Sequence, residues 1–256
     1  MTTPLTTPPL YTALAVADIE SFGRRTDTVQ RTLRSDLHAA LAAALSEEGI
    51  DWSALESKET GDGVILRIPP VIPKTAITRA LTWHLHAALV RRTLSEPPAE
   101  EMRLRLSLHG GEVADDEFGV YGTDLNTACR LVDAQVLRDV LKAATRSHLA
   151  VIASDAWYRA VVRHDHERID RTAYAPALLV MKELRETAWI HVPGQRTPPG
   201  LPPYDPAAES GAPVAAAKAA PTPDARSITI TNSNIHDVVQ GDKHETNYHG
   251  AKGAER

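Results

Sequence analysis

An apolar segment near the N-terminus, residues 11–19, constrains the fold more than any other part of the sequence. Alternate side chains of a β-strand point to opposite sides, so Leu14 and Val16 would face one way and three alanines the other. Both sides are therefore apolar, which is typical of a central strand in a sheet covered on both faces. The segment also carries Asp18, a carboxylate that would be costly to bury without a partner.

Helix and strand patterns follow this segment in alternation. Leucines at four-residue spacing predict an amphipathic helix that Thr26 or Asp27 caps and Gly49 ends. Gly110 and Gly111 are expected to end a later half-buried strand, with its partner starting at Glu112. The other predicted elements up to that point are strands at 52–58 and 64–68 around a Gly-Asp-Gly turn, a helix at 76–94, and the half-buried strand at 104–108.

Past residue 112 the sequence predicts a helix carrying Asn126 and Arg130, a helix at 136–144, and short strands at 151–153 and 188–192. The order of the first six elements is β-α-β-β-α-β. It predicts an α+β fold with a ferredoxin-like core and added elements.

Composition divides the chain into four parts. Residues 1–10 are expected to be disordered, 11–193 to form the domain, 194–226 to be a Pro/Ala-rich linker, and 227–256 to be a short β-prone tail. The tail is too short to fold alone. It is expected either to add a strand to an effector or assembly partner, or to have no specific role.

The charge balance and the single cysteine exclude several classes. A net charge of −5 argues against a general nucleic-acid-binding surface. Cys129 alone cannot form an intrachain disulfide and suits a reducing compartment. No apolar run reaches the length of a membrane span, and no signal peptide is recognisable. A cytoplasmic protein is expected.

Three separated phrases carry the candidate chemistry: 17–22 (ADIESF), 58–63 (KETGDG) and 121–130 (YGTDLNTACR). The first two each place an aspartate at a strand end or tight turn. The third places Asn126 and Arg130 four residues apart, so that they project from one helix face. Two carboxylates for Mg²⁺, with an amide and a guanidinium for ribose and phosphate, suit chemistry on a nucleoside triphosphate.

In this order the phrases resemble class III nucleotidyl cyclases, the adenylate/guanylate cyclase family, over residues 11–193. The resemblance implies that Asp18, the adjacent Ile19 and Asp62 hold two Mg²⁺ or Mn²⁺ ions. It implies that Asn126 positions the ribose and that Arg130 stabilises charge on the α-phosphate. A nucleoside triphosphate is the implied substrate, which becomes a 3′,5′-cyclic nucleotide and pyrophosphate.

The resemblance assigns further substrate contacts. Lys58, in Lys-x-x-Gly-Asp, corresponds to a base-contacting position, and Phe22 lies where a helix start can meet phosphate oxygens. Lys182 resembles a late phosphate-binding lysine, although Arg185 is an alternative. Each residue also has a structural interpretation: turn residues for the aspartates, a solvated lysine for Lys58, and a solvent-facing helix pair for Asn126 and Arg130.

Family active sites form between two protomers, so the resemblance implies a homodimer. Asp18 and Asp62 would come from one chain, and Lys58, Asn126 and Arg130 from the other. An alternative is a catalytically silent module that acts through dimerisation and its tail. The diguanylate cyclase family is a poor candidate because its Gly-Gly-Asp/Glu-Glu-Phe signature is absent.

One departure concerns the base. The adenine-recognising aspartate of the family falls at Gly119, which offers no side-chain hydrogen bond. The pyrimidine cyclases of bacterial antiphage signalling belong to this family and also depart from its purine pattern. A pyrimidine substrate is therefore favoured over ATP, with Asp116, Glu117 or backbone groups as alternative base contacts. By analogy, the product would be an antiviral second messenger read by a separate effector.

Overall fold

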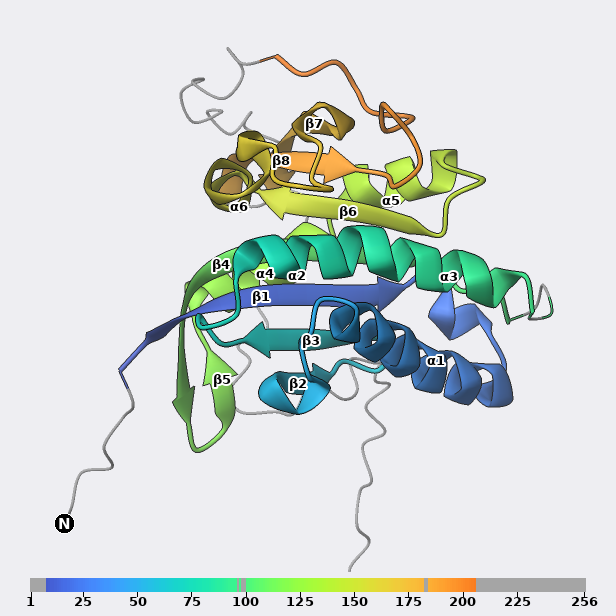
Figure 1. The fold of residues 1–256 in the computed structure, drawn as a ribbon, viewed down its shortest axis with the longest axis horizontal. Helices are drawn as coiled ribbons and strands as arrows, with labels where there is room; N and C mark the ends of the chain where they lie inside the picture. Colours follow the sequence, from blue (N-terminus) through green and yellow to red (C-terminus); the bar gives the residue numbers. More distant parts are fainter. Residues whose placement is uncertain (1–7, 96, 98–99, 182–183, 206–256) are drawn as a thin grey trace, which may run out of the picture. The chain divides into compact units, whose positions relative to one another are not determined.

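The computed structural model describes residues 8–95, 97, 100–181 and 184–205. Its centre is a mixed sheet with the strand order β2-β3-β1-β4-β6-β8-β7, and β5 pairs with β4 beside this path (Figure 1). The strands are β1 (Leu10–Ile19), β2 (Glu56–Glu59), β3 (Gly63–Ile68), β4 (Leu104–Asp116), β5 (Gly119–Tyr121), β6 (Leu149–Ser154), β7 (Tyr174–Met181) and β8 (Leu184–His191).

Helices cover both faces of this sheet. Helix α2 continues without a break into the π-helical segment η3 and then α3. The bounds are α1 (Asp27–Ser46), α2 (Lys74–Arg79), η3 (Ala80–His84), α3 (Leu85–Thr93), α4 (Thr123–Val132), α5 (Gln135–Ala143) and α6 (Asp155–Ala160). The 3₁₀ turn η1 (Phe22–Arg24) lies between β1 and α1, and η2 (Trp52–Ala54) lies before β2.

The first part of the chain has the expected ferredoxin-like topology. Elements β1-α1-β2-β3-α2/α3-β4 follow the β-α-β-β-α-β order, and their strands lie side by side as β4-β1-β3-β2, all antiparallel. The parallel pair β4–β6 then joins this core to the added strands β8 and β7. The α+β fold class is therefore confirmed.

Strand β1 is buried on both sides, as its sequence predicts. Ala13, Ala15 and Ala17 belong to the core cluster that also contains residues of α1 and α2/α3. Leu14 and Val16 belong to a second cluster on the opposite face, closed by Ala128 and Val132 of α4. Asp18 follows Val16 by two residues and so faces the α4 side.

Helix α1 also agrees with its pattern. It begins after Thr26, and four leucines at four-residue spacing are buried: Leu33, Leu37, Leu41 and Leu45. Gly49 follows the helix with a φ of +70°, a conformation that favours glycine.

Two strand boundaries were predicted wrongly. Strand β4 does not end at Gly110–Gly111 but runs through both, because these glycines make room for neighbouring side chains: a Cβ on Gly110 would lie 2.2 Å from the Tyr11 hydroxyl, and one on Gly111 would lie 2.0 Å from Cγ of Asp124. The strand predicted at 52–58 starts only at Glu56. Before it, the Asp51 carboxylate accepts a hydrogen bond from the Ser53 N–H and closes the turn η2.

Residues after β8 remain packed on the domain as far as the structure describes them. Leu201 packs against the cluster under α5, and the Tyr204 hydroxyl lies 2.9 Å from that of Thr187. The rest of the predicted linker and the whole tail lie outside the described residues. Within the described part of the chain, every helix is too short or too polar to cross a membrane.

Gly63 gives a test of this packing. A Cβ at this position would lie 2.1 Å from the backbone oxygen of Ala17 on β1, which cannot move without disturbing the sheet. We expect Gly63→Ala to lower the free energy of unfolding by about 3 kcal/mol, as overpacking does in other cores. Gly23→Ala is the matched control, because nothing lies within 4 Å of its Cβ. Equal chemical denaturation midpoints for the two variants would contradict the packing constraint.

Candidate active site

The ends of β1 and β3 bring the two predicted metal-binding aspartates together. Asp18 pairs with Gly63 across the β1–β3 ladder, and the N–H of Ile19 donates to the backbone oxygen of Asp62 at 2.9 Å. Asp62 therefore occupies the turn beside the end of β1. The two carboxylates are close enough to interact directly.

Arg105 forms the third part of this cluster. It lies opposite Asp18 in the β1–β4 ladder, and its Nη2 donates to the Asp18 carboxylate. Both side chains are largely buried, with 12% and 13% of their surfaces exposed. The Nε of Arg105 is buried and has no hydrogen-bond partner among the described residues.

The environment of Asp18 disfavours its charged form. Burial raises its pKa from 3.8 to about 7, Arg105 opposes this increase, and the neighbouring Asp62 adds to it. A cation placed between the two carboxylates would relieve both the desolvation and the repulsion.

This donor set fits Mg²⁺ or Mn²⁺. In the described part of the chain no group of three or more His, Cys, Asp or Glu side chains has a metal-binding arrangement, so protein side chains alone do not form a cage. Mg²⁺ is commonly held by one or two carboxylates, with the remaining positions taken by water and substrate phosphates. Asp18 and Asp62, with the backbone oxygen of the buried Ile19, match that requirement.

Helix α4 presents the predicted catalytic pair to solvent. Its buried side packs on β1 and β4, where the Ser107 hydroxyl donates to the Ala128 backbone oxygen at 2.8 Å. Asn126 and Arg130 are both exposed. Within the described residues, neither side chain forms a hydrogen bond or ion pair with Asp18 or Asp62.

Lys58 lies on the same side of the sheet as α4. It pairs with Ile65, which belongs to the apolar cluster that α4 closes. Its charge also acts on Cys129: burial and Asp133 raise the pKa of this thiol, whereas Lys58 lowers it. Within one chain, Lys58 therefore lies near α4, and Asp18 lies near Asp62.

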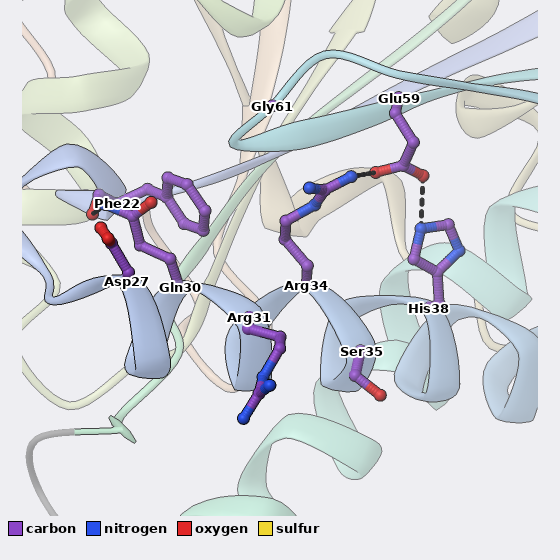
Figure 2. Close-up of a pocket in the computed structure, with 9 residues that line it drawn as sticks. All are labelled: Phe22, Asp27, Gln30, Arg31, Arg34, Ser35, His38, Glu59 and Gly61. Carbon is purple, nitrogen blue, oxygen red and sulfur yellow. Dashed lines mark hydrogen bonds and ion pairs between the residues drawn. The ribbon is translucent and has the colours of Figure 1, made fainter.

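Phe22 lines a groove beside the turn that holds Asp62. The groove has a volume of about 430 Å³ and lies between α1 and the β2–β3 turn (Figure 2). In Figure 2, Arg34 and His38 point from α1 toward Glu59, which both contact, whereas Arg31 points away. The lining residues are Phe22, Asp27, Gln30, Arg31, Arg34, Ser35, His38, Glu59 and Gly61.

Gly119 lies at the start of β5 with a φ of +123°. A Cβ there would meet nothing within 4 Å, so space is not what excludes a side chain; the backbone conformation is. Of the neighbouring acids, Asp116 accepts a hydrogen bond from the Phe118 N–H at 2.8 Å, whereas Glu117 is exposed and makes no hydrogen bond within the described residues.

One predicted site residue lies outside the described part of the chain, and the sequence did not single out three arginines at these sites. Lys182 lies outside the described residues, and its alternative Arg185 lies on β8. Arg105, Arg31 and Arg34 were not predicted. Arg105 alternates with leucines in a half-buried strand, and this pattern does not distinguish a solvent-facing arginine from one paired with a buried aspartate.

Comparisons with known proteins identify the fold. The sequence matches no protein-family model and no functionally curated protein. The structure resembles that of an adenylate/guanylate cyclase/hydrolase from Silicibacter pomeroyi, with a TM-score of 0.52 and 19% identity over 72% of this chain and 98% of that one. It also resembles the guanylyl cyclase Cya2, with a TM-score of 0.50 and 14% identity over 77% of this chain and 98% of that one. The chain therefore has the fold of these cyclase domains.

The burial of Asp18 predicts a pH-dependent stability difference. An acid whose pKa is about 7 in the folded state and 3.8 when unfolded destabilises the fold progressively as the pH rises from about 4 to 7. The substitution Asp18→Asn removes this pH-dependent destabilisation, because asparagine does not ionise. In EDTA, the free energy of unfolding of the variant relative to wild type should increase over that range by at most about 4 kcal/mol and then level off. A difference that is independent of pH would contradict this assignment.

Proposed function

We propose that this protein is a nucleotide cyclase, which converts a nucleoside triphosphate to a 3′,5′-cyclic nucleotide and pyrophosphate. The observation that supports this most strongly is the pairing of β1 with β3. It brings Asp62 beside Asp18, whose side chain faces the α4 side of the sheet, and α4 exposes Asn126 and Arg130. The cyclase fold of the two named structures supports the same function.

The active enzyme is a homodimer in this proposal. Asn126 and Arg130 face solvent and, within the described residues, form no hydrogen bond or ion pair with Asp18 or Asp62, so a partner would bring the two groups together. A two-fold arrangement would create two equivalent sites. In each, one chain would supply Asp18 and Asp62 and its partner would supply Lys58, Asn126 and Arg130.

The protein groups divide the work of binding the triphosphate. Asn126 would hydrogen-bond the ribose, and the planar guanidinium of Arg130 would meet two oxygens of the α-phosphate and stabilise charge that develops there. Backbone N–H groups of the turn at Phe22, before α1, would bind the phosphate chain. Arg105 would add a second guanidinium beside the phosphates once its pairing with Asp18 is relieved.

Asp18 and Asp62, with the backbone oxygen of Ile19, would hold Mg²⁺ or Mn²⁺. When bound, these ions would make the ribose 3′-hydroxyl a better nucleophile and neutralise charge on the departing pyrophosphate. Positioning by the side chains sets the geometry of attack.

A pyrimidine triphosphate is the substrate we favour. The +123° φ of Gly119 disfavours an aspartate at the position that would read adenine. Lys58 can donate to a carbonyl oxygen such as a pyrimidine O2 or O4, or a guanine O6, but cannot accept a hydrogen bond from the amino group of adenine, so it disfavours adenine. The cyclic product would then serve as a second messenger in antiviral defence, read by a separate effector, and the C-terminal tail would bind a partner.

A catalytically silent module is the alternative function. The ion pair between Arg105 and Asp18 favours it, since it occupies a carboxylate that a metal would need. The presence of both aspartates, with Asp62 beside Asp18, and of Asn126 and Arg130 on α4 favours the enzyme.

The direct test is incubation with all four nucleoside triphosphates at equal concentration and Mn²⁺, with products identified by mass spectrometry. Cyclic UMP or cyclic CMP should dominate. Asp62→Ala should reduce turnover at least a hundredfold because one carboxylate is lost, whereas Asp139→Ala on the exposed side of α5 should not change it. No cyclic product from any substrate would support the silent module, and a hundredfold excess of cyclic AMP would refute the assignment of the base.

A second test concerns the composite site. Asp62→Ala and Arg130→Ala chains are each expected to be inactive, but a heterodimer of the two contains one site with every group. Mixing them should restore up to about half of the wild-type activity per heterodimer, since one of two sites is intact. Absence of recovery in a mixture shown by native mass spectrometry to contain heterodimers would contradict a site shared between chains.

A further inference from the structure

A second, larger cavity lies on the opposite side of the sheet from α4. Its volume is about 840 Å³, within the range of small-molecule sites, and it shares no residue with the candidate active site. It is lined by Thr82, Trp83, His86, Asp165, His166, Arg168, Ile169, Asp170, Thr172, Ala173, Tyr174, His191, Pro193, Gly194, Gln195 and Arg196.

One wall is formed by the π-helical segment η3. Such segments are rare and are often found at functional sites. Two threonines distort the helix here, since Thr78 and Thr82 each donate a hydrogen bond to the carbonyl four residues earlier, at 2.8 and 2.7 Å. Trp83 lies in this segment and keeps 57% of its surface exposed, although large aromatic side chains are mostly buried.

The facing loop is held in an unusual conformation. Asp165 and Arg168 have φ values of +50° and +60°, which non-glycine residues rarely adopt. Two carboxylates of the loop already have partners of their own. Asp165 accepts a hydrogen bond from the Arg171 backbone N–H and forms an ion pair with the Arg171 guanidinium at 2.9 Å. Asp170 accepts a hydrogen bond from the Thr172 backbone N–H.

Two exposed guanidinium groups at this cavity therefore lack a strong carboxylate partner. Among the residues that the structure describes, the one ion pair of Arg168 is with Glu167, at 3.9 Å. Arg196 forms no hydrogen bond or ion pair within the described residues, although its charge acts through space on Asp170. A guanidinium suits a phosphate group because its planar array of N–H donors matches the phosphate oxygens.

The interior wall carries imidazoles. The Nδ1 of His86 is buried without a hydrogen-bond partner in the described residues. His191 stacks on Tyr174 with ring centroids 4.6 Å apart, and its Nδ1 lies 3.1 Å from the Ala173 oxygen. Burial lowers the pKa of both histidines and so favours neutral rings, which can hydrogen-bond the edge of a base.

We propose that this cavity is a binding site for a nucleoside monophosphate, distinct from the candidate active site. The indole of Trp83 would stack on the base, His86 would hydrogen-bond its edge, and Arg168 and Arg196 would bind the phosphate. The assignment combines one exposed aromatic face, one unsatisfied buried nitrogen and two available guanidiniums in one cavity of sufficient volume. It does not depend on the cyclase function.

The test is a titration of the full-length protein in EDTA with AMP, GMP, CMP and UMP separately, followed by tryptophan fluorescence. At least one should quench the emission saturably, and Trp83→Phe should remove most of that change. The variant R168Q/R196Q should weaken binding at least about tenfold, since charge-assisted contacts to phosphate are lost. The control Arg163→Gln, an exposed arginine of a neighbouring turn, should bind normally.

Binding at the candidate active site is separated by the variant N126A/R130A, which should keep the same affinity. The nucleoside without its phosphate should bind at least about tenfold more weakly. The proposal is overturned if no monophosphate binds saturably, if R168Q/R196Q binds as wild type does, or if the nucleoside binds as tightly as its monophosphate. Loss of binding in N126A/R130A alone would also overturn it.

Discussion

The close approach of β3 to β1 is the constraint on which the candidate active site depends. Gly63 allows it, because any side chain there would meet the backbone of Ala17. The resulting register places Gly63 opposite Asp18 and so fixes Asp62 beside the end of β1. Because β1 is apolar on both faces, helices pack on each side and hold this strand end in place.

The electrostatics of the strand end follow from the same packing. Asp18 is buried enough to raise its pKa, and its neighbours are one like charge and one opposite charge. Removing Asp62 would relieve repulsion, whereas removing Arg105 would leave a buried carboxylate without its partner. Charge interactions, and not apolar contacts, therefore determine the stability of this cluster. Such charged clusters are unusual in a packed sheet and are typical of sites that bind a cation or a phosphate.

Local patterns predicted the core elements, and the family resemblance selected Asp18 and Asp62 as candidates, but neither predicted features created by tertiary contact. The two-sided apolar pattern of β1 and the leucine spacing of α1 each specify one element, and both are confirmed. The Gly110–Gly111 pair predicts a strand end. In the structure these glycines instead make room for Tyr11 and Asp124, which are distant in sequence and so leave no local signal. Strand β7 contains Pro176, and β5 has three residues, so neither shows a strand pattern. The second cavity, likewise, joins segments far apart in the chain.

The long β1–β4 ladder has a consequence for how the protein is made. Leu10 pairs with Val113 and Ile19 with Leu104, so the central strand finds its second neighbour only after nearly half of the chain has been synthesised. Until then, one edge of an apolar strand has no partner, although α1, β2 and β3 are already available on the other side. Contacts of such large sequence separation slow folding, and exposed strand edges favour association between chains. A nascent chain that stalls before β4 therefore exposes an unpaired apolar strand edge and is prone to associate with other chains.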